Sequence, residues 1–184
     1  MSYAEAAQLG VLMGRGADGL DTEETARAEL LLALAKGVID AETGQSLELA
    51  TTTATLDGVG GRRLLLPRWP VTAVASVTVL DYDDAESELV HGTDYRWTSY
   101  GRLRRLRDCW PRLEQSIEVT YTAGWDPIPD DVRNICLRLA RAGWDNPAGL
   151  EAERLGDWNA KYATAGMLPT SGELRTLSIY RART

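Results

Sequence analysis

Few side chains in this sequence have the type and spacing that catalysis requires. His91 is the single histidine, and the order His91-Gly92-Thr93-Asp94 places a carboxylate near its imidazole, as in a general acid–base pair. The same four residues are typical of a hairpin turn, and we interpret His91 as a solvated loop residue. Ser76 and Ser116 have no neighbouring histidine that would activate a nucleophile. We therefore expect no catalytic residues.

Metal and phosphate sites are not expected either. The aspartates of segment 81–84 lack the glycine and the terminal glutamate of a calcium-binding loop, and we interpret them as a charged turn. No helix is predicted after Gly58-Val59-Gly60-Gly61, so its N-terminus is not available to bind phosphate. Cys109 and Cys136 lie far apart without a Cys-x-x-Cys motif, which argues against a disulfide framework and a zinc site. The sequence predicts no cofactor and no metal.

One short segment is rich in positive charge. Such a patch is typical either of contacts to phosphate or of the solvated face of an edge strand, where charge prevents unwanted pairing. We favour the edge strand. Four arginines around two leucines make up the patch: Arg102, Arg104, Arg105 and Arg107, with Leu103 and Leu106.

The tryptophans lie near turns and near the ends of predicted elements. A tryptophan in such a place often packs one side on the core and leaves the other side for a partner. Packing in the core alone is the other interpretation. We take Trp69, Trp97 and Trp125, together with the arginine patch, as candidates for a partner or subunit interface.

The segment 117–143 fixes how strands and helices follow one another. Alternation of β-branched and polar residues from Ile117 to Thr122 predicts a strand, which ends at Gly124 and the following prolines. Pro129 and the two aspartates after it suit the first turn of a helix. That helix is predicted to end near Gly143, with an apolar face of Val132, Ile135, Cys136, Leu139, Ala140 and Gly143.

Two helices are predicted before residue 45. The first is short and covers Tyr3 to Leu12. The second begins at a capping box formed by Asp21 and Glu24 and ends near Asp40, with Thr43-Gly44 as its stop. Its apolar stripe comprises Ala26, Leu30, Ala33, Leu34, Gly37 and Val38, widened by Leu31 and Leu32.

The middle of the chain is predicted to be sheet and the end helical. Strands are expected near 51–56, 64–66, 71–80, 95–97, 103–106 and 117–122, with hairpin-like spacing that favours antiparallel pairing over a doubly wound fold. Further helical segments are expected around 159–165 and after Ser171, which would cap the last helix. The fold class is α+β, a helical bundle with an antiparallel β module (45–122) inserted between the first long helix and the C-terminal helices (123–184).

Length and charge set further bounds. A chain of 184 residues fits one domain with an inserted module, and the formal net charge of −7 argues against a general nucleic-acid binder. The acidic excess is concentrated in residues 1–50, which hold nine acids and three bases. Without a signal-like N-terminus or an apolar run of about 18 residues, we expect neither secretion nor a membrane span.

Four segments, in this order, resemble the head–tail adaptor (connector) proteins of tailed bacteriophages. The resemblance covers residues 21 to 184. The segments are Val38-Ile39-Asp40-Ala41-Glu42-Thr43-Gly44; Leu65-Leu66-Pro67-Arg68-Trp69-Pro70-Val71 with Val74-Ala75-Ser76-Val77; Val119-Thr120-Tyr121-Thr122-Ala123-Gly124-Trp125 with Ile128-Pro129; and Leu155-Gly156-Asp157-Trp158 with Leu174, Leu177, Tyr180 and Arg181.

The resemblance implies a non-enzymatic virion protein at the head–tail junction. It implies a closed ring, usually of twelve subunits, between the portal protein and the next tail-side connector, with DNA passing through the lumen without sequence-specific contacts. The C-terminal segment, with Tyr180, Arg181 and Arg183, would dock on the portal. We also expect the acidic first region to pair with the arginine patch of a neighbouring subunit across a heterologous interface.

Two other classes stay open from the sequence. A tail terminator is another virion or tail-assembly protein, but such proteins are dominated by sheet with fewer flanking helices. A small hydrolase or transferase would have to build its site from carboxylates and tyrosines, with His91 as its only imidazole.

Overall fold

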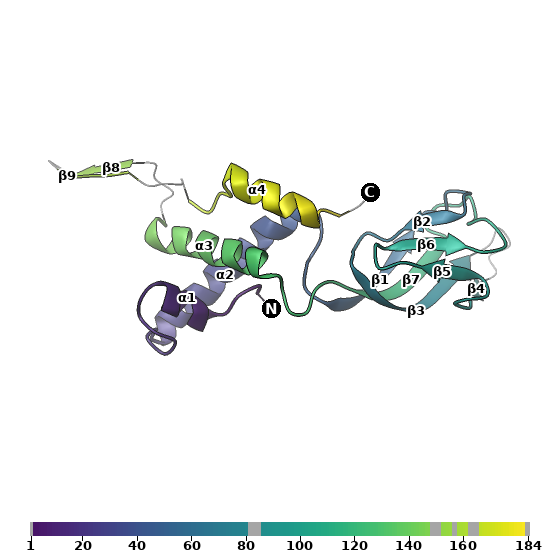
Figure 1. The fold of residues 1–184 in the computed structure, drawn as a ribbon, viewed down its shortest axis with the longest axis horizontal. Coiled ribbons are helices and arrows are strands. Elements are labelled where there is room, and N and C mark those ends of the chain that lie inside the picture. Colours follow the sequence, from purple (N-terminus) through teal and green to yellow (C-terminus); the bar gives the residue numbers. More distant parts are fainter. Residues whose placement is uncertain (1, 81–85, 148–151, 156–157, 162–165, 183–184) are drawn as a thin grey trace. The chain divides into compact units, whose positions relative to one another are not determined.

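The chain folds as two compact units, which the computed structural model describes over residues 2–80, 86–147, 152–155, 158–161 and 166–182 (Figure 1). The helical unit comprises Met1–Gly44 and Ile128–Arg181, and the β unit is formed mainly by Gln45–Pro127. The β unit therefore interrupts the sequence of the helical unit. This order confirms the predicted α+β class with an inserted antiparallel module. Among the described helices, none is long and apolar enough to cross a membrane.

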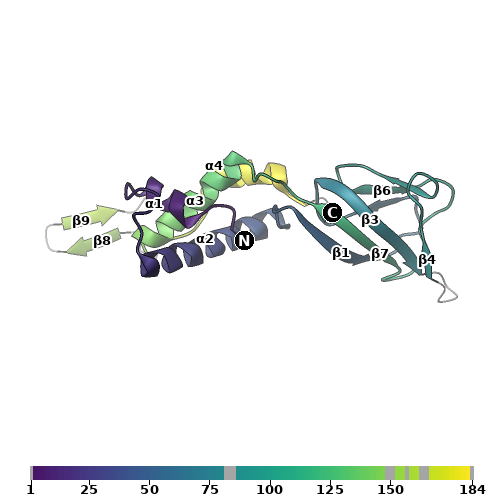
Figure 2. The ribbon, with the colours of Figure 1, turned by 90° about the horizontal axis from the view of Figure 1, so that it is seen from below.

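Two long helices form the centre of the helical unit (Figures 1 and 2). They are α2 (Thr22–Thr43) and α3 (Asp130–Asp145). The shorter α1 (Ala6–Leu12) and α4 (Ser171–Leu177) pack against both of them, and the 3₁₀ turn η1 (Ser178–Tyr180) follows α4 directly. The buried side chains between these elements include Leu9, Leu32, Ile39, Ile135, Leu139 and Leu177.

The ends of α2 follow the predicted signals. The Asp21 carboxylate accepts the backbone N–H of Glu24 at 2.8 Å, and the Glu24 side chain accepts the N–H of Asp21, which completes the capping box. The helix continues to Thr43, three residues beyond the predicted end near Asp40. Gly44 then takes a left-handed conformation with φ of 67°, which a residue with a side chain rarely adopts.

The helix opened by Pro129 is also as predicted on its buried side. Pro129 occupies the N-cap of α3, and Asp130 and Asp131 lie in its first turn, where their charge favours the positive end of the helix dipole. All six residues of the predicted apolar face are buried: Val132, Ile135, Cys136, Leu139, Ala140 and Gly143.

The predicted apolar stripe of α2 has to be corrected. Its members Ala26, Leu30, Ala33, Leu34 and Gly37 are exposed. The stripe that α2 buries, the inner stripe, consists of Ala28, Leu32, Ala35 and Ile39, and of these only Leu32 belonged to the predicted stripe. Because α2 is apolar on two sides, periodicity alone could not identify the side that faces the core.

Two predictions for the C-terminal region are wrong in detail. The segment expected to be helical from residue 159 begins with a strand, since β8 (Ala152–Leu155) and β9 (Trp158–Lys161) form an antiparallel hairpin. In the sequence, a Gly-Asp pair stands between the two strands, and this pair of residue types favours a hairpin. The prediction of a helix did not take this pair into account. Further along, Thr170 rather than Ser171 caps α4, because its hydroxyl accepts the N–H of Glu173.

Two antiparallel sheets pack against each other in the β unit (Figure 2). The large sheet has the strand order β1-β7-β3-β4 and the small sheet the order β2-β6-β5. The large sheet contains β1 (Ala50–Leu56), β3 (Val71–Leu80), β4 (Glu86–Glu88) and β7 (Ile117–Ala123), and the small sheet contains β2 (Arg63–Leu65), β5 (Tyr95–Trp97) and β6 (Arg102–Arg105). The core between them is built around Val77, Tyr95, Leu103, Trp110, Val119 and Tyr121. Of the described strands, β4 alone had no counterpart among the predicted segments of this unit.

The expected position of the arginine strand is also wrong. β6 is the central strand of the small sheet and pairs with β2 on one side and β5 on the other. Its arginines therefore do not protect an open sheet edge. Their positive charge needs another explanation.

Candidate assembly surfaces

The residues considered for catalysis do not form a reactive site. Among the described residues, no group of three or more histidine, cysteine or carboxylate side chains is placed to hold a metal ion. His91 is exposed, with its ring 5.6 Å from that of Tyr95, and the carboxylate of Asp94 accepts the backbone N–H of Val90 at 2.8 Å. Cys109 is exposed and Cys136 is buried, both as free thiols. The aspartates of 81–84 lie outside the described residues.

The exposed side of α2 is the most apolar feature of the helical unit. We define it as the outer stripe: Ala26, Leu30, Ala33, Leu34 and Gly37. Leu30 is 61% exposed and Leu34 is 51% exposed. A methyl group added at Gly37 would meet no atom within 4 Å, so this side of the helix is open. Full burial of one leucine side chain contributes about 1.5–3 kcal/mol, so burial of the exposed halves of Leu30 and Leu34 would contribute roughly 2–3 kcal/mol in total.

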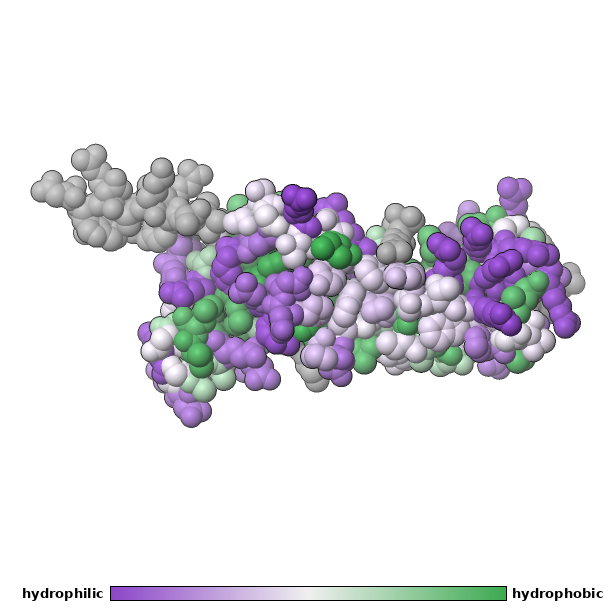
Figure 3. Space-filling view, viewed as in Figure 1, coloured by the Kyte–Doolittle hydropathy of each residue, from purple (hydrophilic) through white to green (hydrophobic). Residues whose placement is uncertain are grey.

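Hollows flank the outer stripe on both sides. One has a volume of about 530 Å³ and lies between α2 and the N-terminal segment, with Ala4, Glu29 and Ala33 among its lining residues. The other has a volume of about 370 Å³ and lies toward the end of α3, where Leu30, Leu34 and Met167 contribute. On the face of the helical unit in Figure 3, apolar side chains also gather over α1, where Val11 is 58% exposed. A ridge between two hollows is a shape that another helix can pack against.

The outer side of the small sheet carries a row of arginines. Arg63, Arg104 and Arg96 are directly opposite one another across β2, β6 and β5, and all three are exposed. Arg102 lies on the same side, two residues before Arg104. In the described part of the chain, none of these four arginines forms an ion pair. We call these four residues the arginine face; Figure 3 shows this part of the β unit as strongly hydrophilic.

Two of the predicted arginines differ from the other two. Arg105 points toward the core side: its side chain is 13% exposed, and its guanidinium lies 5.5 Å from the centre of the Trp110 ring and 3.4 Å from Asp108. Arg107 follows β6 and is exposed, and its carbonyl oxygen accepts a hydrogen bond from Arg62 at 2.9 Å. Of the predicted patch, Arg102 and Arg104 therefore lie on the arginine face, whereas Arg105 supports the fold.

The predicted tryptophans are half-buried and pack mainly on their own unit. Trp69 and Trp125 meet edge to face, with ring centres 5.2 Å apart, and Tyr100 lies 6.4 Å from Trp69. Trp97, on β5, packs against the core of the β unit and lies 6.4 Å from His91. The structure thus brings Trp69 and Trp125 together, while Trp97 lies in a separate place.

The predicted C-terminal residues contact the helical unit. The Tyr180 hydroxyl donates to both carboxylate oxygens of Asp131 at 2.9 Å. Burial, together with the bond to this carboxylate, raises the pKa of Tyr180 to about 12. Arg181 donates to the carbonyl oxygen of Glu42 at 3.2 Å, at the end of α2. Arg183 lies outside the described residues.

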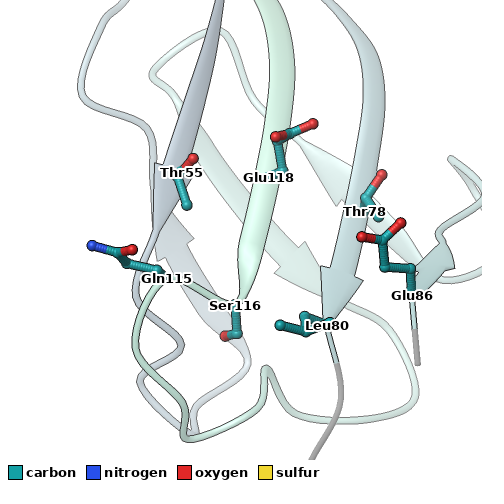
Figure 4. A pocket seen from close by; sticks show the side chains of 7 residues that line it. All are labelled: Thr55, Thr78, Leu80, Glu86, Gln115, Ser116 and Glu118. Atoms are coloured by element: carbon teal, nitrogen blue, oxygen red, sulfur yellow. The ribbon is translucent and has the colours of Figure 1, made fainter. Parts of the chain in front are cut away.

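The outer side of the large sheet was not among the predicted sites. The hydroxyl group of Thr51 forms a hydrogen bond with that of Thr122 at 2.8 Å, and Thr53 does the same with Thr120 at 2.9 Å. These hydrogen bonds link β1 to β7. Beyond these threonines, a hollow of about 200 Å³ opens on the same side, and Figure 4 shows Glu118, Thr78 and Glu86 around it. The alternation of Glu118, Thr120 and Thr122 along the strand was the signal for this face.

A model of a family described as head completion protein matches residues 18–141 of the chain. The search of curated proteins gave no match.

Three solved structures resemble the chain at 20% sequence identity. A chain from the neck of an empty gene transfer agent particle, computed with C6 symmetry, aligns with a TM-score of 0.63 over 97% of this chain and 89% of that chain. A chain from the virion of a native gene transfer agent particle gives 0.64 with the same coverage. A chain from the neck of a native particle, computed with C12 symmetry, gives 0.55 over 97% and 91%. At 20% identity, this similarity establishes the fold alone.

Proposed function

The chain belongs to the head completion protein family, and on this premise we propose that it is a head–tail adaptor whose subunits form a ring through the outer stripe of α2. Its role is structural and its place is the head–tail junction of a phage-like particle. The observation that carries the ring proposal is the second apolar side of α2. An apolar side of a helix is normally buried. In this subunit the outer stripe is left for a neighbour.

A ring requires a heterologous interface, in which one surface of each subunit meets a different surface of the next. The ridge of the outer stripe and the two hollows beside it supply surfaces of different shape. Two of the similar chains come from necks that were computed with C6 and C12 symmetry, and we take a cyclic arrangement of about twelve copies as the arrangement for this chain as well. The portal protein and the next tail-side connector are the partners that this place implies.

The experiment compares three proteins after each is mixed with the cognate portal protein. Electron microscopy and mass measurement of the wild-type chain should give a ring of about twelve subunits stacked on the portal. In a Leu30→Asp/Leu34→Asp variant the ring should be lost, because two charges would enter an apolar interface. Val90→Asp is the matched control: Val90 is 60% exposed but belongs to the β unit, and its ring should form as in the wild type. Normal rings from the double variant would contradict the proposal.

A further inference from the structure

The β unit has outer sides of opposite charge. On the small sheet, Arg63, Arg104 and Arg96 form one row across three strands, and Arg102 extends it. On the large sheet, Glu118 and Glu88 both lie directly opposite Thr78, so these residues form a row across β7, β3 and β4. Glu86 lies on the same side, opposite Leu80. We call Glu86, Glu88 and Glu118 the glutamate face; all three are exposed.

Like charges placed directly opposite in a sheet destabilise it. The row of three arginines therefore weakens the isolated β unit, and within the described part of the chain no acidic side chain forms an ion pair with it. The glutamates of the other face are not directly opposite one another, but Glu86, Glu88 and Glu118 likewise form no ion pair among the described residues. A partner that brings the opposite charge would relieve both faces.

The two rows match in spacing. Neighbouring strands lie about 4.8 Å apart, so Arg63 and Arg96, two strands apart, are separated by roughly 9.6 Å along the sheet. Glu118 and Glu88 are also two strands apart and have the same separation. Arg104 lies between Arg63 and Arg96 in one row, and the shorter Thr78 lies between Glu118 and Glu88 in the other. The hollow beside Thr78, bordered by Glu118 and Glu86, has room for a longer side chain (Figure 4).

We infer that the arginine face of one subunit packs on the glutamate face of the next subunit, with Arg104 entering the hollow between Glu118 and Glu86. Guanidinium groups bind carboxylates through paired hydrogen bonds, and this fixes the register of the contact. The inference rests on the proposed ring and adds a second, charged contact between the same neighbours. It replaces the pairing of the arginines with the acidic N-terminal region that the sequence suggested.

A second copy of the chain fits the arginine face better than DNA does. Residues 45–127 hold twelve acids and nine bases, so the β unit itself has a net charge of −3, and the whole chain has −7. A phosphate backbone would meet this negative field around four arginines. The two faces also lie on opposite sides of a two-layer unit. A head-to-tail contact between such faces is heterologous, which is the type of contact that a ring requires.

Charge exchange tests this contact in the full-length chain. The dissociation constant of the assembled ring would be measured by mass measurement over a dilution series. Arg104→Glu and Glu118→Arg should each raise it at least tenfold. The combined Arg104→Glu/Glu118→Arg chain should return to within about threefold of the wild type, since the opposite charges meet again. Arg175→Glu, an exposed arginine of α4, is the matched control and should have no effect.

Cross-linking tests the geometry independently of affinity. In a Cys109→Ser background, Arg104→Cys and Thr78→Cys in the same chain should be cross-linked between neighbours by a short bifunctional maleimide, because an arginine side chain separates the two positions too widely for a direct disulfide, and a denaturing gel should show a ladder of covalent oligomers. The inference would be overturned if rings form without this ladder and if Arg104→Glu and Glu118→Arg each assemble with the wild-type dissociation constant. That result would leave the proposed ring through α2 unaffected. No ring in the wild type would instead refute the proposed function. Binding of a DNA duplex that Arg104→Glu abolishes, with unchanged ring affinity, would assign the arginine face to DNA and overturn the inference too.

Discussion

The helices α2 and α3 pack against each other but use their opposite sides differently. α3 buries one apolar side, and its other side carries arginines that are paired within the chain: Arg133 with Asp130, Arg138 with Glu173 and Arg141 with Asp145. α2 buries Leu32 and Ile39 and leaves Leu30 and Leu34 exposed on another side. The polar side of α3 thus finds its ion-pair partners within the subunit, whereas the outer stripe of α2 stays exposed to water.

This difference separates what folding needs from what assembly needs. The inner stripe of α2 and the apolar side of α3 account for the core of the helical unit. The outer stripe adds nothing to that core, and an exposed apolar ridge favours association with another chain. Selection for folding alone would leave this side of α2 as polar as that of α3.

The largest contrast is expected between two leucines of α2. Leu32→Ala should lower the free energy of unfolding by about 2–5 kcal/mol, because it leaves a cavity in the core. Leu30→Ala should change the unfolding of the dilute monomer by less than about 0.5 kcal/mol, since this side chain already contacts water. Urea denaturation at concentrations below ring assembly measures both. A large loss from Leu30→Ala would show that the outer stripe belongs to the subunit core.

A medium effect on the free energy of unfolding is expected from the ion pair between α3 and α4. The Glu173 carboxylate accepts from Arg138 and Thr170 at 2.7 and 2.8 Å. Burial by itself raises the pKa of Glu173, but the hydrogen bonds from Arg138 and Thr170 outweigh it and hold the pKa below its ordinary 4.5. Glu173→Gln should therefore reduce stability by about 1–2 kcal/mol at neutral pH.

The pH dependence of this pair checks the cause. A carboxylate with a lowered pKa contributes stability above its unfolded pKa and loses it as the pH falls through the folded pKa. The difference between Glu173→Gln and wild type should accordingly be complete above pH 4.5 and shrink below it. Denaturant unfolding at several pH values measures this, and a constant difference across that range would mean that the charge is not responsible.

A smaller change in the free energy of unfolding, this time a gain in stability, is expected at Gly37. Because the position is open and lies within α2, Gly37→Ala should stabilise the monomer by about 0.5–1 kcal/mol through helix propensity. In the ring, the added methyl group should hinder close approach of the neighbouring subunit. Higher thermal stability combined with weaker assembly would identify an interface position. Unchanged assembly would place Gly37 outside the contact.

The smallest effect is expected on the polar side of α3. Arg141 and Asp145 form an exposed pair at 3.4 Å. Exposed pairs of this kind contribute about 0.5 kcal/mol or less, so Asp145→Asn should hardly change the urea midpoint or the ring. A clear loss of assembly would show that α3 also takes part in the subunit contact.

The sequence predicts most elements because their signals are local. The capping box at Asp21, the proline at the start of α3 and the alternation in β7 each depend on neighbouring residues. The direction in which α2 faces could not be predicted, since it has two apolar sides and only the packing of α3 selects one. The position of β6 likewise depends on its pairing with β2, which is distant in sequence; the local hairpin with β5 alone would leave β6 at a sheet edge.

The candidate assembly surfaces could be predicted only in part from the sequence. Arg102 and Arg104 were found through their charge, but Arg63 and Arg96 join them only through the register of the small sheet. The same holds for Glu118, which the large sheet places in one row with Glu88. Tyr180 was selected as a partner residue, yet within the chain it binds Asp131. Cross-strand and cross-helix neighbours are set by the tertiary fold.

The most direct test is a side-chain-resolution reconstruction of the assembled head–tail junction by electron cryo-microscopy. We predict a ring of adaptor subunits in which Leu30 and Leu34 of each α2 are buried against the neighbouring subunit. A ring that leaves both leucines in contact with water, or a junction in which this chain forms no ring, would contradict the account.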